Sequence, residues 1–209
     1  MVDTCIITAT GPSVDELDFE PLRDKVDLIC VNKPYLSGMM RHWVFLDGCT
    51  ADQFENQFFN NEHAHIWCTE NTKRRHPLPC QTIFKRESGR GFGINLRKHS
   101  VYICGSSTFF AVQVAYLLDY KHIYLVGIDG GSVGKKMWCN GRNNTASTVG
   151  RPPGFEREAS NWEWLFESKH PVVDRMTLSS SYNTRPWYNL YRNMPHKDVI
   201  QHIAENVHV

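Results

Sequence analysis

The stretch Ser106–Gly131, with the sequence SSTFFAVQVAYLLDYKHIYLVGIDGG, decides the fold class of this chain. Hydroxyl residues open it, and apolar residues then recur at helical spacing up to about Tyr120. The near-continuous apolar run His122–Gly127 indicates a strand buried on both faces, as in the centre of a parallel sheet. With the apolar run Val101–Cys104 before it, the stretch predicts a strand, a capped helix and a central strand.

The rest of the chain repeats this alternation of short apolar runs and helical segments. Thr4–Thr10 and Asp27–Asn32 predict strands, joined by a helix that runs from a capping box at Ser13 and Glu16 to about Lys25. Further strands are expected at His42–Asp47, His63–Thr69, Thr82–Lys85 and Val172–Leu178, and further helices at Thr50–Asn60, Arg157–Lys169 and Lys197–Asn206. This succession predicts an α/β protein, a Rossmann-like three-layer sandwich with a mostly parallel sheet and a lid-like insertion.

The length of 209 residues favours a single domain that spans residues 1–209. Residues 71–100 are rich in proline, glycine and basic residues, and we expect an irregular excursion there. Residues 130–154 are glycine-rich and polar, which predicts a mobile lid.

Composition narrows the function classes. With 23 lysines and arginines against 22 acids, the chain as a whole is not an electrostatic nucleic-acid binder. Basic clusters at residues 73–76 and 85–99 are either solvated surface or contacts to a polyanion. None of the seven cysteines forms a CxxC pair, so we expect buried thiols rather than zinc ligands. We find no apolar run long enough to span a bilayer, and we expect a cytoplasmic location.

Polar residues follow several predicted strands directly. In open parallel sheets the ligand lies outside the carboxyl ends of the strands, so these residues would share one rim. They are Gly11, Pro12, Ser13, Asn32, Asp47, Gly105, Ser106, Ser107, Thr108, Asp129 and Gly130. Each has an ordinary alternative as a turn or helix-capping residue. Together they predict a nucleotide site, since helix N-termini suit phosphate and Asn32 offers a donor and an acceptor to a base or ribose.

The cations Lys135, Lys136 and Arg142 lie in the predicted lid, where they would close over a phosphate. The alternative for this segment is a solvent loop. The chain contains neither GxGxxG nor GxxxxGK[ST], which excludes the standard dinucleotide fingerprint and the P-loop.

The run Ser106–Asp129 resembles the core segment of the bacterial sialyltransferases of glycosyltransferase family 42, and it is similar to the related 6-hydroxymethylpterin pyrophosphokinase-like group. TGPSVDEL at 10–17 resembles their first phosphate-side loop, and LICVNKPY at 28–35 resembles their second strand. The resemblance implies that Gly11, Pro12 and Ser13 line the nucleotide phosphate, that Asn32 touches the nucleotide, that Ser106, Ser107 and Thr108 contact base or sugar, and that Asp129 and Gly130 lie beside the ribose.

The catalytic residues stay open at this point. The family carries a histidine base before the helix that follows the lid, whereas this chain has no histidine between His122 and His170. The carboxylates Asp129, Asp47, Glu156 and Glu158 are the candidates by chemistry.

Three functions compete. The first is a glycosyltransferase that moves a sugar from a nucleotide-sugar donor to a hydroxyl of a glycan, a small molecule or a modified DNA base. The aromatic and basic residues of Tyr182–Tyr191 could stack on bases, so DNA stays a possible acceptor. The alternative is that this segment docks on the domain. The second is a diphosphokinase-like phosphotransferase with Mg²⁺ held by Asp47 and Asp129. The third is a non-catalytic protein that binds nucleotides or nucleotide-sugars, and the oligomeric state stays open in all three.

Overall fold

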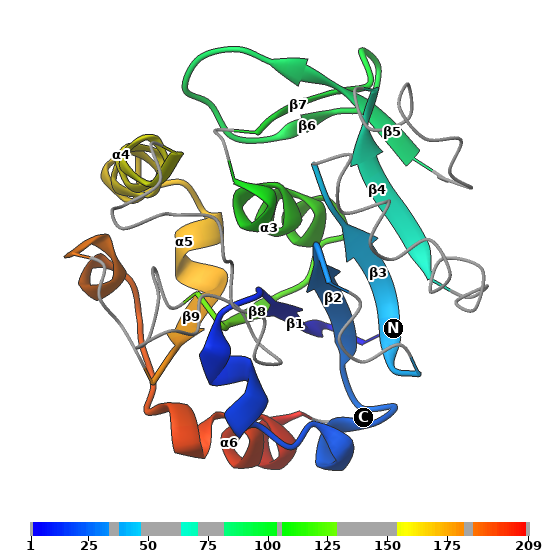
Figure 1. Cartoon of the computed structure of the whole chain (residues 1–209), viewed down its shortest axis with the longest axis vertical. Helices are drawn as coiled ribbons and strands as arrows, with labels where there is room; N and C mark the ends of the chain where they lie inside the picture. Colours follow the sequence, from blue (N-terminus) through cyan, green and yellow to red (C-terminus); the bar gives the residue numbers. More distant parts are fainter. Residues whose placement is uncertain are drawn as a thin grey trace, which may run out of the picture.

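The computed structural model describes residues 2–33, 38–46, 64–70, 82–103, 106–128, 154–181 and 186–207. Within these ranges nine strands form one open sheet in the order β6-β7-β5-β4-β3-β2-β1-β8-β9 (Figure 1). Every pair of neighbours is parallel except β6 and β7. The prediction of an α/β protein with a mostly parallel sheet is therefore confirmed.

The strands are short. Their bounds are β1 Thr4–Thr8, β2 Asp27–Val31, β3 Met40–Val44, β4 His65–Thr69, β5 Thr82–Glu87, β6 Ile94–Asn95, β7 Ser100–Tyr102, β8 His122–Val126 and β9 Met176–Ser179. Continuous apolar runs located most of them because inner strands of a parallel sheet are covered on both faces. The run His122–Gly127 was expected to be central. β8 is an inner strand, but it lies next to the edge strand β9 rather than at the centre of the sheet.

Two strand predictions need correction. The region 71–100 was expected to be irregular apart from a short strand at Thr82–Lys85. That strand is confirmed as β5, but the described part of the region also contains β6 and the start of β7. The segment Val172–Leu178 was expected to be one strand. It begins instead as the short helix α5, Val172–Arg175, and only then continues as β9. Adjacent valines favour a strand locally, but Pro171 adopts helical backbone angles and Val173 N donates to His170 O at 2.9 Å, which starts a helical turn instead.

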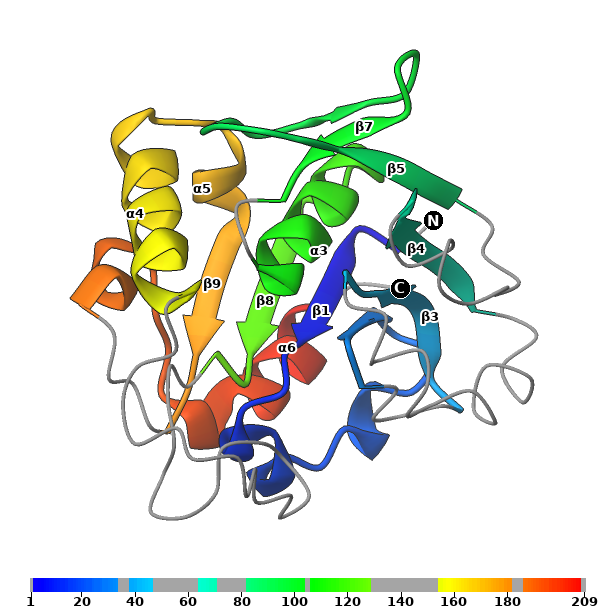
Figure 2. The same ribbon diagram turned by 45° about the horizontal axis from the view of Figure 1, so that its top comes forward.

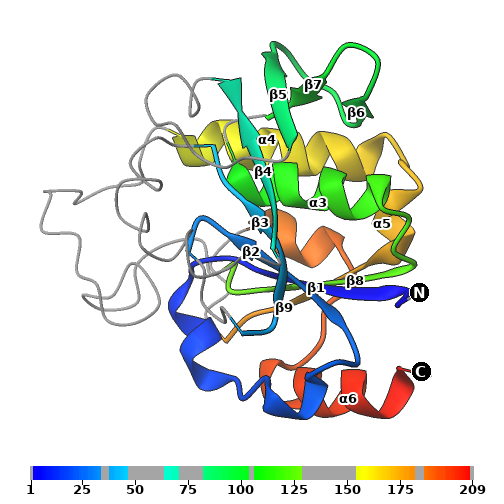
Figure 3. The same cartoon turned by 90° about the vertical axis from the view of Figure 1, so that its right-hand side faces the viewer.

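Helical segments lie on both faces of the sheet (Figure 3). On one face are α3 (Ser107–Leu117), α4 (Gly154–Glu167), α5 and the 3₁₀ segment η3 (Pro186–Leu190). On the other are α6 (Val199–Asn206) and the 3₁₀ segments η1 (Pro12–Glu16) and η2 (Glu20–Leu22), with η4 (His196–Asp198) leading into α6. The helix expected at Thr50–Asn60 and the lid segment up to residue 153 lie outside the described residues.

The helix α3 is enclosed almost all round. Residues 107 to 115 are all buried, including Phe110 and Val114 of the expected apolar stripe. Its aromatic residues contact other elements edge to face: Phe110 meets Phe84 of β5, and Phe109 meets Trp162 of α4. The sequence prediction of one buried stripe underestimated this burial, because Phe92 of the β5–β6 connection and Trp162 of α4 also pack on α3.

The helix predicted from Ser13 to Lys25 is wrong. The chain forms two 3₁₀ turns instead, with Gly11 as the N-cap of η1 and no side-chain capping bond at that position. Pro21 lies in the first turn of η2 and cannot continue a helix that began at Ser13, because it lacks an N–H and its ring clashes with the preceding turn.

The aromatic segment near the C-terminus docks on the domain. Trp187 is 1% exposed and stacks on Trp162 of α4 at 4.9 Å between ring centroids. Tyr188 and Tyr191 are also buried. These three rings are therefore unavailable for stacking on DNA bases, which corrects that alternative for the described part of the segment. Cys5, Cys30 and Cys68 are buried thiols that form no disulfide, and their burial agrees with the prediction.

Candidate functional site

Two neighbouring inner strands of the sheet, β1 and β2, end near buried polar atoms that lack a partner. Thr8 is the last residue of β1, and Asn32 follows β2 directly. Thr8 Oγ1 and Asn32 Oδ1 are both buried, and neither has a hydrogen-bond partner. A buried unpaired polar atom costs about 1–3 kcal/mol, so a hydrogen-bond partner supplied by a ligand or by water at this edge would be stabilising.

The backbone hydrogen bonds of Asn32 fix this residue without using its side-chain oxygen. Its N–H donates to Val44 O at 2.9 Å, and its carbonyl accepts from Trp43 Nε1 at 3.1 Å. Asn32 adopts φ +59°, a left-handed conformation that asparagine tolerates better than most residues. The backbone is thus fixed by β3, while the amide oxygen stays available for a donor.

This position is next to the switch point of the sheet. From β1 the chain moves outward through β2 to β5, and β8 returns on the other side of β1. Gly127, after β8, has φ +76°, and a Cβ there would lie 2.3 Å from Val14 Cγ2. Gly127 O also accepts from Gly11 N at 2.8 Å. The loops after β1 and β8 are therefore in direct contact, as the rim hypothesis requires.

The loop after β1 offers less to a phosphate than the sequence predicted. The N–H of Gly11 is bonded to Gly127, Pro12 has no N–H, and Ser13 is fully buried. The carbonyl of Ser13 accepts a hydrogen bond from His196 Nε2 at 2.8 Å. This loop can shape a pocket wall, but Gly11 and Pro12 present no free N–H to an anion.

His196 was missed by the sequence analysis. A carbonyl can only accept, so Nε2 of His196 carries a proton, and in the neutral ring Nδ1 accepts from Ser179 Oγ at 2.9 Å. The ring therefore joins the end of β9 to the loop after β1. The one local signal was a histidine directly after Pro195, which is too weak to predict a contact with a residue so far away in sequence.

A carboxylate lies at the start of α3. Ser106 is the N-cap, since its Oγ accepts from Phe109 N at 3.3 Å. The same hydroxyl donates to Glu158 Oε1 at 2.9 Å, and Trp162 Nε1 donates to that oxygen at 3.4 Å. Glu158 is only 9% exposed. The structure thus brings together the hydroxyl and one of the carboxylates that the sequence proposed for the site.

This arrangement changes the chemistry expected at the α3 start. Ser107 and Thr108 are each 8% exposed, so the first turn is mostly covered. A buried carboxylate beside it repels an anion and accepts hydrogen bonds from hydroxyl or amino groups. The described part of the rim is therefore rich in acceptors, which suits a sugar or a ribose better than a phosphate.

The remaining predicted site residues cannot be placed. Asp47, Gly105, Asp129, Gly130, Lys135, Lys136 and Arg142 lie outside the described residues, as does the side chain of Glu156, whose backbone lies in α4. Within the described ranges no group of three His, Cys, Asp or Glu side chains is arranged to hold a metal ion.

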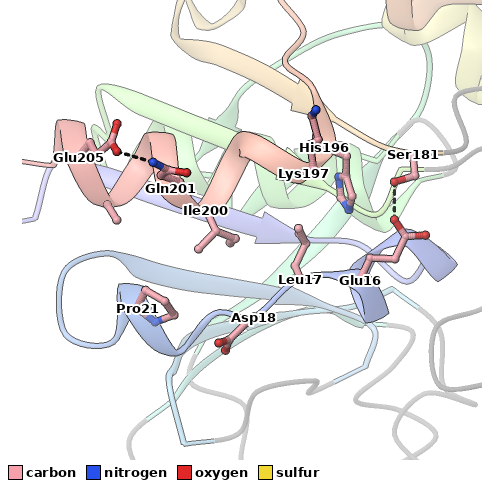
Figure 4. Close-up of a pocket in the computed structure, with 11 residues that line it drawn as sticks. Glu16, Leu17, Asp18, Pro21, Ser181, His196, Lys197, Ile200, Gln201 and Glu205 are labelled. Carbon is pink, nitrogen blue, oxygen red and sulfur yellow. Dashed lines mark hydrogen bonds between the residues drawn. The ribbon is translucent and has the colours of Figure 1, made fainter.

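A groove of about 650 Å³ lies along α6, between this helix and the 3₁₀ segments η1 and η2 (Figure 4). Its apolar floor includes Leu17, Pro21 and Ile200. Glu16 lies at one end, where its Oε2 accepts from Ser181 Oγ at 2.5 Å. His196 also lines this groove, whereas neither Thr8 nor Asn32 does.

A second polar cluster lies at the opposite, amino edge of the sheet. Trp67 Nε1 donates to His42 Nδ1 at 3.2 Å, which places the proton of the neutral His42 ring on Nε2. That nitrogen lies 3.4 Å from Tyr120 Oη, and Tyr120 in turn donates to Asp27 Oδ2 at 2.6 Å. The donors thus run in one direction, from Trp67 toward the Asp27 carboxylate, which also lies 3.5 Å from Arg41.

Burial controls the protonation of this amino-edge cluster. Desolvation lowers the pKa of His42 to about 4, against a smaller opposing effect of Asp27, while His65 and Arg41 lower it further. Burial and the hydrogen bond to Asp27 raise the pKa of Tyr120 above its ordinary value. At neutral pH His42 is therefore uncharged. Sequence analysis had no signal for this cluster, because its members come from the three strands β2, β3 and β4 and from the turn before β8.

Comparisons with known proteins identify no relative: no protein-family model, curated protein or solved structure matches this chain. Among the described residues, no helix has the length and apolar character needed to cross a membrane. Functional inference therefore depends on the geometry of the carboxyl rim.

Proposed function

We propose that this chain is a glycosyltransferase that binds a nucleotide-sugar donor at the carboxyl edge of β1, β2 and β8 and transfers the sugar to a hydroxyl acceptor. The observation that carries the proposal is the pair of buried, unpartnered atoms Thr8 Oγ1 and Asn32 Oδ1 beside the switch point of the sheet. The finer fold prediction, a three-layer sandwich closed by a lid at residues 130–154, belongs to this proposal.

The chemistry of the rim supports a sugar-bearing ligand. Asn32 Oδ1 accepts only, Thr8 Oγ1 accepts or donates, and the Glu158 carboxylate accepts. Ribose and hexose hydroxyls supply the matching donors. The phosphates need cations or free N–H groups instead, and we assign them to Lys135, Lys136 and Arg142 of the lid segment.

The reaction follows from these assignments. The acceptor oxygen forms a bond to the anomeric carbon of the donor while the bond from that carbon to the phosphate oxygen breaks. A carboxylate takes the acceptor proton, and the nucleotide leaves as an anion that the lid cations stabilise. Asp129, Asp47 and Glu156 are the proposed bases. Glu158 is less suited, because one of its oxygens already accepts from Ser106 and Trp162.

The first experiment is a thermal-shift screen with CMP, UDP, GDP and ATP and with their sugar conjugates. A nucleotide at 100 times its dissociation constant adds about 2.7 kcal/mol of stability. Transfer is then measured as release of the free nucleotide in the presence of acceptor alcohols, with and without EDTA. Loss of all activity in EDTA together with ATP dependence would favour the phosphotransferase, and binding without turnover would favour a non-catalytic binder.

Thr8→Val provides the sharpest variant, and Thr4→Val is its matched control. Both threonines are buried in β1 on the same side, but Thr4 Oγ1 donates to Asp3 Oδ1 at 3.0 Å whereas Thr8 Oγ1 has no partner. Valine at position 8 should weaken nucleotide-sugar binding about tenfold without lowering the stability of the free protein. The control should lose stability and keep its affinity. Equal affinity in the wild type and the Thr8 variant would refute the assignment of the site.

A further inference from the structure

The strands β5, β6 and β7 form a basic arm, defined here as residues 82–103, at one margin of the sheet (Figure 2). The arm holds five lysines and arginines against a single acid, Glu87, whereas the whole chain is nearly balanced. Positive charge is therefore concentrated on this margin. The proposed sugar transfer makes no use of it.

The tip of the arm is the turn Leu96–His99 between β6 and β7. Leu96 is 54% exposed, the highest value among the large apolar side chains of the described residues. Arg97, Lys98 and His99 follow it and are also exposed. The turn therefore presents an aliphatic side chain directly beside basic side chains.

The turn is held in place by its own hydrogen bonds. Asn95 Oδ1 accepts from Lys98 N at 3.0 Å, and Leu96 O accepts from His99 N at 3.4 Å. His99 O then accepts from Lys85 N of β5 at 2.6 Å. The exposure of Leu96 is therefore a property of a fixed turn rather than of a loose end.

The arm cations differ in whether they already have partners. Arg86 donates to Thr69 Oγ1 and Leu46 O, and Arg90 donates to Ser160 Oγ. The ion pairs found in the described part of the chain involve other cations, so Lys85, Arg97 and Lys98 face no carboxylate within those ranges.

We propose that the tip of the basic arm docks on an anionic lipid surface, with Leu96 inserted among the acyl chains and Arg97 and Lys98 at the phosphate headgroups. One apolar side chain or one cation alone gives weak, reversible attachment, whereas the two together supply both terms of peripheral binding. This inference is independent of the proposed sugar transfer.

Lipid fits this tip better than nucleic acid. Binding of single-stranded nucleic acid uses exposed aromatic rings as stacking platforms. In the arm, Phe92 is packed against Phe109 and Tyr116 of α3, and the ring of Tyr102 lies against Gly91. The exposed apolar group is the aliphatic Leu96, which suits acyl chains.

The test is co-sedimentation of the full chain with vesicles of phosphatidylcholine, with or without about 30% phosphatidylglycerol, at low and high salt. We expect binding only to the anionic vesicles and weaker binding at high salt. The variant Arg97→Ala/Lys98→Ala should lower the partition coefficient by about 25-fold, since each cation contributes about fivefold. Leu96→Ser should lower it by about tenfold.

The matched control is Arg192→Ala/Lys197→Ala, which removes one exposed arginine and one exposed lysine from the α6 side of the sheet. It should change the partition coefficient by less than about twofold, because these charges lie away from the arm. Thermal melting should show all variants folded. The proposal is overturned if the control and the arm variants lose vesicle binding equally, or if the wild type does not bind anionic vesicles. It is also overturned if the wild type binds duplex or single-stranded DNA in place of lipid and the arm variants lose that DNA binding.

Discussion

The protonation of His42 should set a large part of the pH dependence of stability. The pKa of the buried ring is about 4, compared with 6.5 for the ordinary side chain. Each pKa unit corresponds to about 1.4 kcal/mol, so the full difference is about 3.4 kcal/mol. Because the pKa is lowered in the folded state, the unfolded chain takes up the proton first as the pH falls. The contribution is therefore complete above pH 6.5 and is lost between 6.5 and 4.

The perturbation that isolates this contribution is His42→Asn. The asparagine oxygen can still accept from Trp67 Nε1, but the side chain does not titrate. Linkage between the two pKa values predicts that the wild type loses about 2 kcal/mol between pH 7.5 and pH 5.0 through His42 alone. The pKa values of His65 and His170 are lowered by burial too, and both residues remain in the variant, so their contributions cancel in the comparison.

The assay is urea denaturation of both proteins at 25 °C at the two pH values. The variant should be less stable than the wild type at pH 7.5, and the difference should shrink by about 2 kcal/mol at pH 5.0. If the two proteins instead lose the same stability on acidification, His42 is not held neutral by burial, and the directed chain from Trp67 to Asp27 is wrong.

Three further predictions concern the rim. Gly127→Ala should destabilise the fold by about 2–3 kcal/mol in urea denaturation, because φ +76° is strained for alanine and its Cβ would overlap Val14; an unchanged midpoint would contradict the tight contact of the two loops. His196→Ala should cost about 1–2 kcal/mol by the same assay, whereas His196→Gln, which can still donate to Ser13 O, should recover part of the loss; equal loss in both would mean that this bond contributes little. Asp129→Ala should abolish nucleotide release and leave the melting temperature unchanged, and full turnover in the variant would reduce Asp129 to a turn residue.

The sheet was largely predictable because its signal is local. β1, β2, β4 and β8 are covered on both faces and so appear as apolar runs, with errors of one or two residues at the ends. The two-residue β6 left no such trace. The helix expected after β1 failed because Ser13 and Glu16 match a capping pattern, whereas Pro21 and the burial of Ser13 favour two 3₁₀ turns.

The candidate site was predictable only in outline. The topology rule correctly placed Asn32 and the loop after β1 near the switch point, since it needs only strand order. It could not show that the N–H of Gly11 donates to Gly127 O, or that Glu158 lies beside Ser106. Those contacts join residues far apart in sequence. The sequence likewise did not predict that the Thr8 hydroxyl has no hydrogen-bond partner, because threonine is common at the end of an apolar strand.

The enclosure of α3 has a consequence for how a ligand is received. A helix with a solvent-facing side can shift when a ligand binds. Residues 107 to 115 of α3, in contrast, are all buried against neighbouring elements. Moving its first turn would disturb close-packed side chains all around it. The first turn of α3 is therefore held in one position, and a ligand of the proposed site would have to match that fixed shape.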